Sequence, residues 1–247
     1  MSKMAHLKIF RGDAQRGEMV DYQVPIAPGM VVLDAIHAVQ ATQAPDLAVR
    51  WNCKAGKCGS CGGEVNGKPR LMCMDRMDKY ADGEPITIRP LKTFPVIKDL
   101  ATDVSWNYTV NKTIPAFQPP AGQAELNFSQ AEADRVQEFR KCIECFLCQN
   151  VCHVLREHEK YDDFGGPRFF VRVAGLEMHP QDTADRTGLL KDDLGLGYCN
   201  ITKCCTEVCP ENIAITDNAI IPLKERVADR FFDPLRALWR MLFGSKT

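Results

Sequence analysis

Residues 142–152 read CIECFLCQNVC, and residues 199–210 read CNITKCCTEVCP. The first stretch has the spacing C-x2-C-x2-C-x3-C, which is the bacterial run that ligates [4Fe–4S] clusters. The second stretch begins and ends in the same way, but Thr202 stands where the middle cysteine would be. An extra cysteine, Cys204, lies one residue out of register. The two stretches therefore predict a domain that holds two different iron–sulfur clusters.

The cysteine runs also predict how the ligands are shared. In two-cluster ferredoxins the fourth cysteine of a run ligates the other cluster. The expected [4Fe–4S] ligands are then Cys142, Cys145, Cys148 and Cys209. Three thiolates remain for the second cluster, from Cys152, Cys199 and Cys205. A cubane that lacks one thiolate readily lacks the iron at that corner, so we expect a [3Fe–4S] centre. Cys204 is interpreted as a small buried hydrophobic residue rather than a ligand.

A third group of cysteines begins in the loop CKAGKCGSCGG, residues 53–63. Its spacing, C-x4-C-x2-C followed by a distant cysteine, is the plant-type [2Fe–2S] pattern. Small residues suit a loop that must bring backbone amides close to the cluster sulfurs. A zinc site is the alternative, because C-x2-C is also half of a zinc knuckle. The longer pattern favours the cluster. Its expected ligands are Cys53, Cys58, Cys61 and Cys73.

Composition narrows the class of protein. The 247 residues include 12 cysteines and carry 31 basic against 32 acidic side chains, without a basic run. Nucleic-acid binding is therefore not expected. No signal peptide or apolar membrane-spanning stretch is visible, so we expect a soluble chain of a reducing compartment. In such a compartment many cysteines indicate metal or redox chemistry rather than disulfides.

The first hundred residues predict strands with one helix. Residues 6–10 and 21–27 have the alternation of half-buried strands, and residues 30–43 have apolar positions at helical spacing. Asn66-Gly67 is a strong signal for a tight hairpin turn, and residues 84–91 supply another strand. These features fit a β-grasp ferredoxin-like domain.

The remainder predicts helices after a connecting segment. Residues 101–128 are rich in Pro, Asn and Thr and are interpreted as an inter-domain connection. Ser129 and Glu132 form the pattern of a capping box, and residues 168–178 and the segment after Pro222 are further helix candidates. We therefore expect an α+β protein. Residues 1–105 would form the [2Fe–2S] β-grasp domain, and residues 106–247 an all-helical domain like bacterial ferredoxins.

The order of these motifs resembles the iron–sulfur subunit of succinate dehydrogenase and fumarate reductase. The resemblance is carried by WNCKAGKCGSCGGEVNGKPRLMC (51–73), FPVIKDLATD (94–103), CIECFLCQNVC and KCCTEVCP (203–210). It implies a subunit of an oxidoreductase that passes single electrons between the covalent FAD of a flavoprotein partner and quinone at a membrane anchor. The [2Fe–2S] cluster would lie nearest the flavin and the [3Fe–4S] cluster nearest the membrane. No acid, base or nucleophile of its own is implied, and the expected location is the cytoplasmic face of a bacterial inner membrane.

Two features bear on the membrane anchor. Many family members whose anchors hold one haem or none have a tryptophan shortly after the equivalent of Cys152 and a histidine after that of Cys199, whereas this chain has HVLREHEK (153–160) and Asn200. This departure favours relatives that pair with a two-haem anchor. Residues 233–243 read DPLRALWRMLF and predict an amphipathic helix that rests on a membrane or partner, or packs on its own domain.

Two other functions remain open at this point. One is the iron–sulfur subunit of a soluble fumarate reductase that uses a thiol donor. The other, from a different class, is a zinc-stapled assembly scaffold. His153 and His158, which follow the cysteine run, are interpreted as surface or packing residues.

Overall fold

The computed structural model describes residues 3–81, 83–122 and 127–234. The chain forms two compact units that are not continuous in sequence. The first unit contains residues 1–107, 143–151 and 208–211, and the second contains residues 108–142, 152–207 and 212–247. Two short segments of the cysteine runs thus belong to the N-terminal unit. The predicted boundary at residue 105 stays a prediction.

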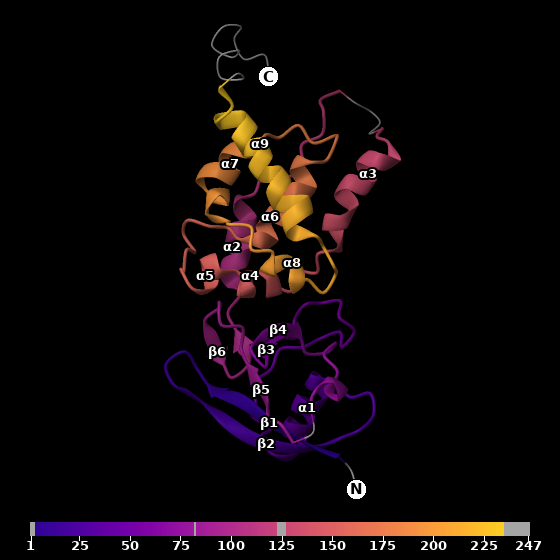
Figure 1. Ribbon diagram of the computed structural model, residues 1–247, viewed down its shortest axis with the longest axis vertical. Helices are drawn as coiled ribbons and strands as arrows, with labels where there is room; N and C mark the ends of the chain where they lie inside the picture. Colours follow the sequence, from indigo (N-terminus) through magenta and orange to yellow (C-terminus); the bar gives the residue numbers. More distant parts are fainter. Residues whose placement is uncertain (1–2, 82, 123–126, 235–247) are drawn as a thin grey trace. The chain divides into compact units, whose positions relative to one another are not determined.

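The first unit is built on a five-stranded sheet (Figure 1). Across the sheet the strands are β2 (Gly17–Ile26), β1 (Lys3–Gly12), β5 (Ile86–Arg89), β3 (Gly62–Val65) and β4 (Lys68–Leu71). β1 and β5 are parallel, and the other neighbours are antiparallel. The strands predicted in residues 6–10, 21–27 and 84–91 and the Asn66-Gly67 hairpin are confirmed. The hairpin turn is formed with both residues at positive φ, 48° and 73°.

Helix α1 (Val32–Thr42) packs apolar side chains into the core that covers this sheet. Val32, Ile36 and Val39 are fully buried, at the helical spacing that the sequence predicted. They share one hydrophobic core with Leu7 and Ile9 of β1. The apolar residues that alternate along the strand and those that recur every 3.6 residues along the helix therefore pack in the same core.

The segment predicted as a connection is more ordered than expected. β6 (Val96–Lys98) pairs with β7 (Ala101–Thr102), and α2 (Ser105–Thr113) follows directly. Asp103 accepts a hydrogen bond from the amide of Ser105 at 2.8 Å, which helps to begin the helix. Helix α2 is hard to predict from the sequence, because its side chains are mostly polar and its buried residue is Asn107.

The described part of the second unit is helical and contains no strand. Its helices are α3 (Gln130–Gln137), α5 (His153–Arg156), α6 (Pro167–Glu177), α7 (Thr187–Asp192), α8 (Cys204–Glu207) and α9 (Ile221–Phe231). Two 3₁₀ turns, η2 (Glu138–Lys141) and η3 (Leu196–Tyr198), and a π-helical segment, η4 (Ile215–Ile220), complete it. The capping box of Ser129 and Glu132 and the helices at 168–178 and after Pro222 are confirmed.

Arg186 connects separate segments of this helical unit through buried hydrogen bonds. Its side chain is fully buried and donates to the carboxylate of Asp182 at 2.9 Å. It also donates to the carbonyl oxygens of Pro115 and Ala116, at 3.0 and 2.8 Å. A buried guanidinium is tolerated because all of these acceptors face it. Arg186 thereby ties the segment after α2 to the start of α7.

The α+β class predicted from the sequence is confirmed. The names β-grasp and bacterial-ferredoxin-like remain predictions for the two parts. Within the described residues, none of the helices combines the length and the apolar character needed to cross a membrane. The amphipathic helix predicted from Asp233 onwards lies outside the described residues beyond position 234.

Candidate metal centre

The loop of the first cysteine group directs backbone amides at sulfur. The amides of Ala55 and Lys57 donate to the Sγ of Cys53, at 3.4 and 3.3 Å. Downstream, the amide of Cys73 donates to the Sγ of Cys61 at 3.4 Å. Amide donors stabilise negative charge on sulfur, and hydrogen bonds to sulfur tune the potential of a cluster. The loop therefore fits thiolates that hold an iron–sulfur group.

The thiols of this loop differ in acidity. Burial opposes ionisation of Cys58, but hydrogen bonds from Ser60 and Cys53 lower its pKa to about 6. Burial raises the pKa of Cys61 to about 12. The thiolate is the form that binds metal. The Cys58 thiol therefore ionises readily without a metal. The Cys61 thiol must lose its proton when a metal binds.

Gly59 shows how tightly this loop is packed. Its φ is +69°, and a Cβ placed on it would stand 2.7 Å from the Cα of Cys145. Both residues belong to the first unit. Because only glycine has neither the steric penalty at positive φ nor a Cβ, the loop can approach the second cysteine run here.

Residues 143–151 of the second run are held by buried polar contacts. Asn150, on α4 (Leu147–Val151), donates from Nδ2 to the carboxylate of Glu64 at 2.8 Å. Its Oδ1 accepts from the amide of Thr93 at 3.1 Å, and its carbonyl accepts from the Thr93 hydroxyl at the same distance. All three residues are buried in the first unit. Cys145 and Cys148 are therefore carried on a segment fastened to the sheet-containing unit.

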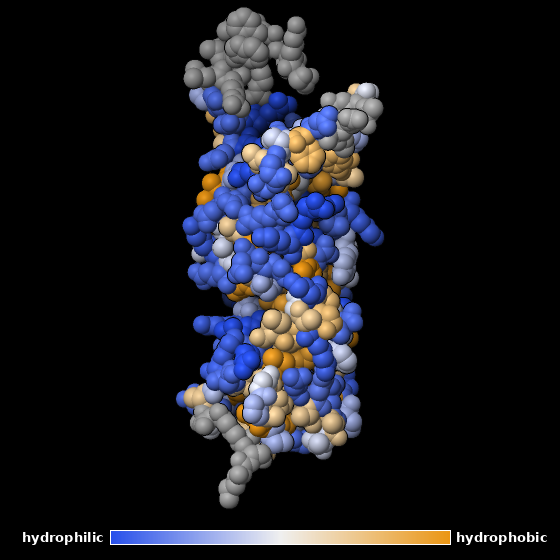
Figure 2. All heavy atoms as spheres, turned by 90° about the vertical axis from the view of Figure 1, so that its right-hand side faces the viewer, coloured by the Kyte–Doolittle hydropathy of each residue, from blue (hydrophilic) through white to orange (hydrophobic). Residues whose placement is uncertain are grey.

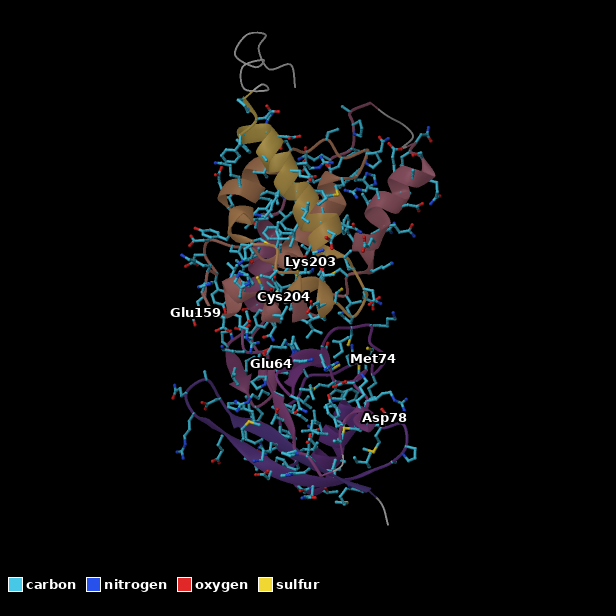
Figure 3. The ribbon with its side chains drawn as sticks, viewed as in Figure 1. Glu64, Met74, Asp78, Glu159, Lys203 and Cys204 are labelled. Atoms are coloured by element: carbon cyan, nitrogen blue, oxygen red, sulfur yellow. The ribbon has the colours of Figure 1, made fainter. Side chains whose placement is uncertain are left out.

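The second unit contains a cavity lined by four cysteines. They are Cys152, Cys199, Cys204 and Cys205. Thr202, His153 and Thr216 also line it, and Phe164, Pro167 and Ile220 supply apolar walls. Figure 3 labels Cys204, the first residue of α8, and its neighbour Lys203 on the loop before it. Four thiols around one cavity form a donor set suited to iron.

Hydrogen bonds and burial distinguish these thiols. The Sγ of Cys205 lies 3.5 Å from the hydroxyl of Thr216, and the Sγ of Cys204 lies 3.2 Å from the hydroxyl of Thr202. Burial raises the pKa of Cys152 to about 12 and that of Cys205 to about 11. Among the described residues, no three His, Cys, Asp or Glu side chains are arranged to share a single metal ion. An iron–sulfur cluster instead offers a separate iron to each thiolate.

The backbone has the same conformation at matching steps of the two runs. In the run from Cys142, the second and fourth residues after the first cysteine, Glu144 and Phe146, have φ of 56° and 59°. In the run from Cys199, the residues at the same steps, Ile201 and Lys203, have φ of 61° and 62°. Left-handed conformations at bulky residues are uncommon, so their repetition at equal steps shows one loop design used twice.

This shared design fixes which positions correspond. Thr202 takes the position of Cys145, and Cys204 takes the position of Leu147. The sequence register that placed threonine at the missing cysteine thus agrees with the backbone. The ligand assignments themselves stay predictions.

Comparisons with known proteins agree with these centres. A family described as "2Fe-2S iron-sulfur cluster binding domain" matches residues 6–108, and one described as "4Fe-4S dicluster domain" matches residues 138–213. The fumarate reductase iron–sulfur subunit of Wolinella succinogenes is 31% identical over 92% of this chain and 96% of its own length. That of Mycobacterium tuberculosis is 31% identical over 78% of this chain and 79% of its own. The chain belongs to the family of fumarate reductase and succinate dehydrogenase iron–sulfur subunits.

A solved structure supports the membership of this iron–sulfur subunit. The chain matches a structure titled "Mycobacterium smegmatis Sdh1 complex in the apo form" with a TM-score of 0.93 and 60% identity. The match covers 95% of this chain and all of the other. The resemblance identified from the cysteine motifs is therefore confirmed.

Sequence reasoning missed several residues of this iron–sulfur subunit. Thr216, which approaches Cys205, lies eleven residues after that cysteine and belongs to no motif. Glu64 could have been noticed from the sequence, because it is a charged residue between glycines and valine in a strand. Its side chain is buried. His153 lines the cavity and packs edge-on against His158 at 6.0 Å between ring centroids, so its interpretation as a packing residue holds in part.

Proposed function

We propose that the chain passes single electrons between the covalent FAD of a flavoprotein partner and quinone at a membrane anchor. The observation that carries this proposal is the four-cysteine cavity of the second unit, found together with the amide-lined cysteine loop of the first. Membership of the family makes the chain a subunit of a succinate- or fumarate-converting enzyme complex. Its own contribution is to hold and tune cofactors, since they carry the chemistry.

Three clusters are assigned to the three cysteine groups. The [2Fe–2S] ligands are Cys53, Cys58, Cys61 and Cys73. The [4Fe–4S] ligands are Cys142, Cys145, Cys148 and Cys209, supported by their spacing in the sequence. The [3Fe–4S] ligands are Cys152, Cys199 and Cys205, supported by the cavity they line. When bound, such clusters change charge one electron at a time, whereas a flavin exchanges two electrons with succinate or fumarate.

The chain's own groups prepare each site. Amides of Ala55, Lys57 and Cys73 donate to thiol sulfur and so favour added negative charge there. The apolar walls formed by Phe164 and Ile220 limit the access of water to the cavity of the second unit. A drier site strengthens every charge interaction within it. These groups set the potential rather than take part in bond making.

The flavoprotein is proposed to dock around the first cysteine loop. Trp51 and Met74 flank this group in sequence and are 47% and 56% exposed. The Lys54 ammonium lies 4.9 Å from the Trp51 ring centroid, and His37 packs edge-on against the same ring. Figure 2 shows apolar side chains that reach the surface among hydrophilic ones in the sheet-containing unit. Large exposed apolar residues are typical anchors of protein interfaces.

The membrane side is proposed to involve an anchor with two haems. The segment His153–Lys160 holds no tryptophan, and Asn200 stands after Cys199 where relatives with one haem or none have a histidine near quinone. We also propose that the chain is bound peripherally, on the cytoplasmic face of a bacterial inner membrane.

Purification from detergent-solubilised membranes tests this function. We expect a flavoprotein and a hydrophobic anchor to co-purify, a brown colour, and iron in the sum of the three clusters. Replacing Trp51 and Met74 together by serine should release the flavoprotein, whereas Ile97→Ser, at another exposed apolar residue of the same unit, should not. A colourless zinc protein, or a free monomer that is fully active as a carrier, would contradict the proposal.

A further inference from the structure

Cys204 lies on the cavity of the second unit although the cysteine pattern does not require it. Its Sγ lies 3.2 Å from the hydroxyl of Thr202, the residue at the corner without a cysteine. Cys152, Cys199 and Cys205 line the same cavity. The one thiol beyond the three expected ligands is therefore the one beside the empty corner.

Comparison with the other run shows that this position is not simply filled by a small apolar residue. Leu147 occupies the same step and is 1% exposed, packed into the core of the first unit. Cys204 is only partly buried and turns its thiol to the cavity. A side chain that served only as packing would be expected to be fully buried, as Leu147 is. Cys204 is therefore less buried than the sequence predicted, and its role stays a prediction.

The segment around Thr202 is also accessible to an ion from solvent. Thr202 and Lys203 are exposed, and Ile201 is 40% exposed. The cysteine side chain has one rotatable bond before its sulfur, so the Sγ of Cys204 can leave the Thr202 hydroxyl without moving the backbone. A ferrous ion can thus meet both the open corner and a thiol that reaches it.

We propose that Cys204 is an accessory ligand for a fourth iron, an inference that rests on the [3Fe–4S] assignment proposed above. A reductant supplies one electron to the [3Fe–4S]⁺ cluster, and the reduced cluster then takes up Fe²⁺ to give [4Fe–4S]²⁺. The new Fe–S bond to Cys204 forms as its S–H bond breaks, and the proton passes to solvent. In reverse, an oxidant would remove one electron, Fe²⁺ would leave, and the Cys204 thiolate would take up a proton from solvent. The site would couple the iron content of the cluster to reduction and to the supply of ferrous iron.

The test uses the whole complex, purified anaerobically with either the wild-type chain or Cys204→Ala. EPR of the air-oxidised complex first shows whether a three-iron signal is present, which tests the proposed function alone. Each complex is then reduced with dithionite in the presence of ⁵⁷Fe²⁺ and desalted. Mössbauer spectroscopy measures the labelled iron in the cluster. Glu207→Ala, at an exposed position of α8, controls for local disturbance of the helix.

The wild type and Glu207→Ala are expected to take up about one labelled iron per chain and to show a [4Fe–4S] spectrum. Ferricyanide should then release this iron and restore the three-iron signal. Cys204→Ala should keep its three-iron centre and take up none. Equal uptake by Cys204→Ala, or no uptake by a wild type that shows the three-iron signal, would refute the role of Cys204 alone. A wild type without any three-iron signal would overturn the cluster assignment and this inference together.

Discussion

Asn150 donates a hydrogen bond from Nδ2 to the buried carboxylate of Glu64, at 2.8 Å. The two residues are 86 positions apart in the chain, and both are less than 5% exposed. Asn150 follows Cys148 by two residues on α4, and Glu64 lies on β3, labelled in Figure 3. The contact therefore joins a cysteine run to the sheet through two buried groups. Water cannot easily take the place of either partner.

Asn150→Ala should loosen this run. It removes a donor from a buried carboxylate and an acceptor from the Thr93 amide, and such losses cost about 1–3 kcal/mol each. We expect a lower thermal midpoint and a weakened [4Fe–4S] signal in the reduced protein. Asn111→Ala, at an exposed position of α2, should change stability by less than about 0.5 kcal/mol. Equal effects of the two substitutions would show that the Glu64 contact has no special weight.

Gly59→Ala should disrupt the first cysteine loop. The added Cβ would meet the Cα of Cys145 at 2.7 Å, in a conformation with φ of +69°. Gly67→Ala is a matched control, because its φ is +73° and nothing lies within 4 Å of the added Cβ. The control should lose only the cost of the left-handed conformation, about 1–2 kcal/mol. Iron content and the [2Fe–2S] EPR signal should fall in Gly59→Ala and remain in Gly67→Ala.

Thr202→Cys should change the type of the cluster. It restores the regular spacing at the position that the backbone equates with Cys145. We expect the three-iron EPR signal of the oxidised protein to disappear and a [4Fe–4S] centre of lower potential to replace it. Iron content per chain should rise correspondingly. Persistence of the three-iron signal would mean that position 202 does not face the open corner.

Cys204→Ser, examined in the protein as isolated, should leave all three cluster signals in place. Cys204 acts in our proposal only when the cluster is reduced and ferrous iron is added. EPR of the oxidised and the dithionite-reduced protein, without added iron, measures this. Loss of the three-iron centre in the variant would make Cys204 a resident ligand and would overturn the assignment of Thr202 as well.

The stability of the second unit should depend on the protonation of Glu177. Burial raises the pKa of this carboxyl group, against the opposing effect of the Arg186 amide and Arg226. The folded state therefore holds the proton more tightly than the unfolded state, whose pKa is about 4.3. This contribution is fully present below the unfolded pKa and is lost as pH rises through the folded pKa.

Glu177→Gln removes that dependence. The difference in thermal midpoint, wild type minus variant, should fall as pH is raised from about 5 to 8, a range above the unfolded pKa. Glu225→Gln, at an exposed position of α9, is the control and should show a constant difference. A difference for Glu177→Gln that is flat with pH would rule out the buried carboxyl as a titrating group in this range.

Local patterns predicted much of this molecule. The helix at Val32–Thr42, the Asn66-Gly67 hairpin and the Ser129–Glu132 capping box are each encoded within a few neighbouring residues. The threonine at the missing cysteine position was also visible, since a repeated spacing can be compared with itself. In these cases the determining contacts lie close together in the sequence.

Other features depend on contacts that sequence spacing does not reveal. The pairing of Glu64 with Asn150 joins distant segments, and Thr216 reaches Cys205 from a π-helical segment. The left-handed residues Phe146 and Lys203 carry side chains that normally avoid this conformation, so their type gave no signal. The position of the Cys204 thiol likewise followed only from the folded loop.

The first unit takes its residues from three places in the chain, ending with 208–211. A ribosome makes residue 107 on the order of ten seconds before residue 211, at about 5–20 residues per second. The sheet therefore emerges well before the segments that complete its unit. Until Cys145 has been made, the loop around Gly59 lacks the segment that packs against it. During translation this interval is the period in which the nascent chain most needs protection from oxidation and from aggregation.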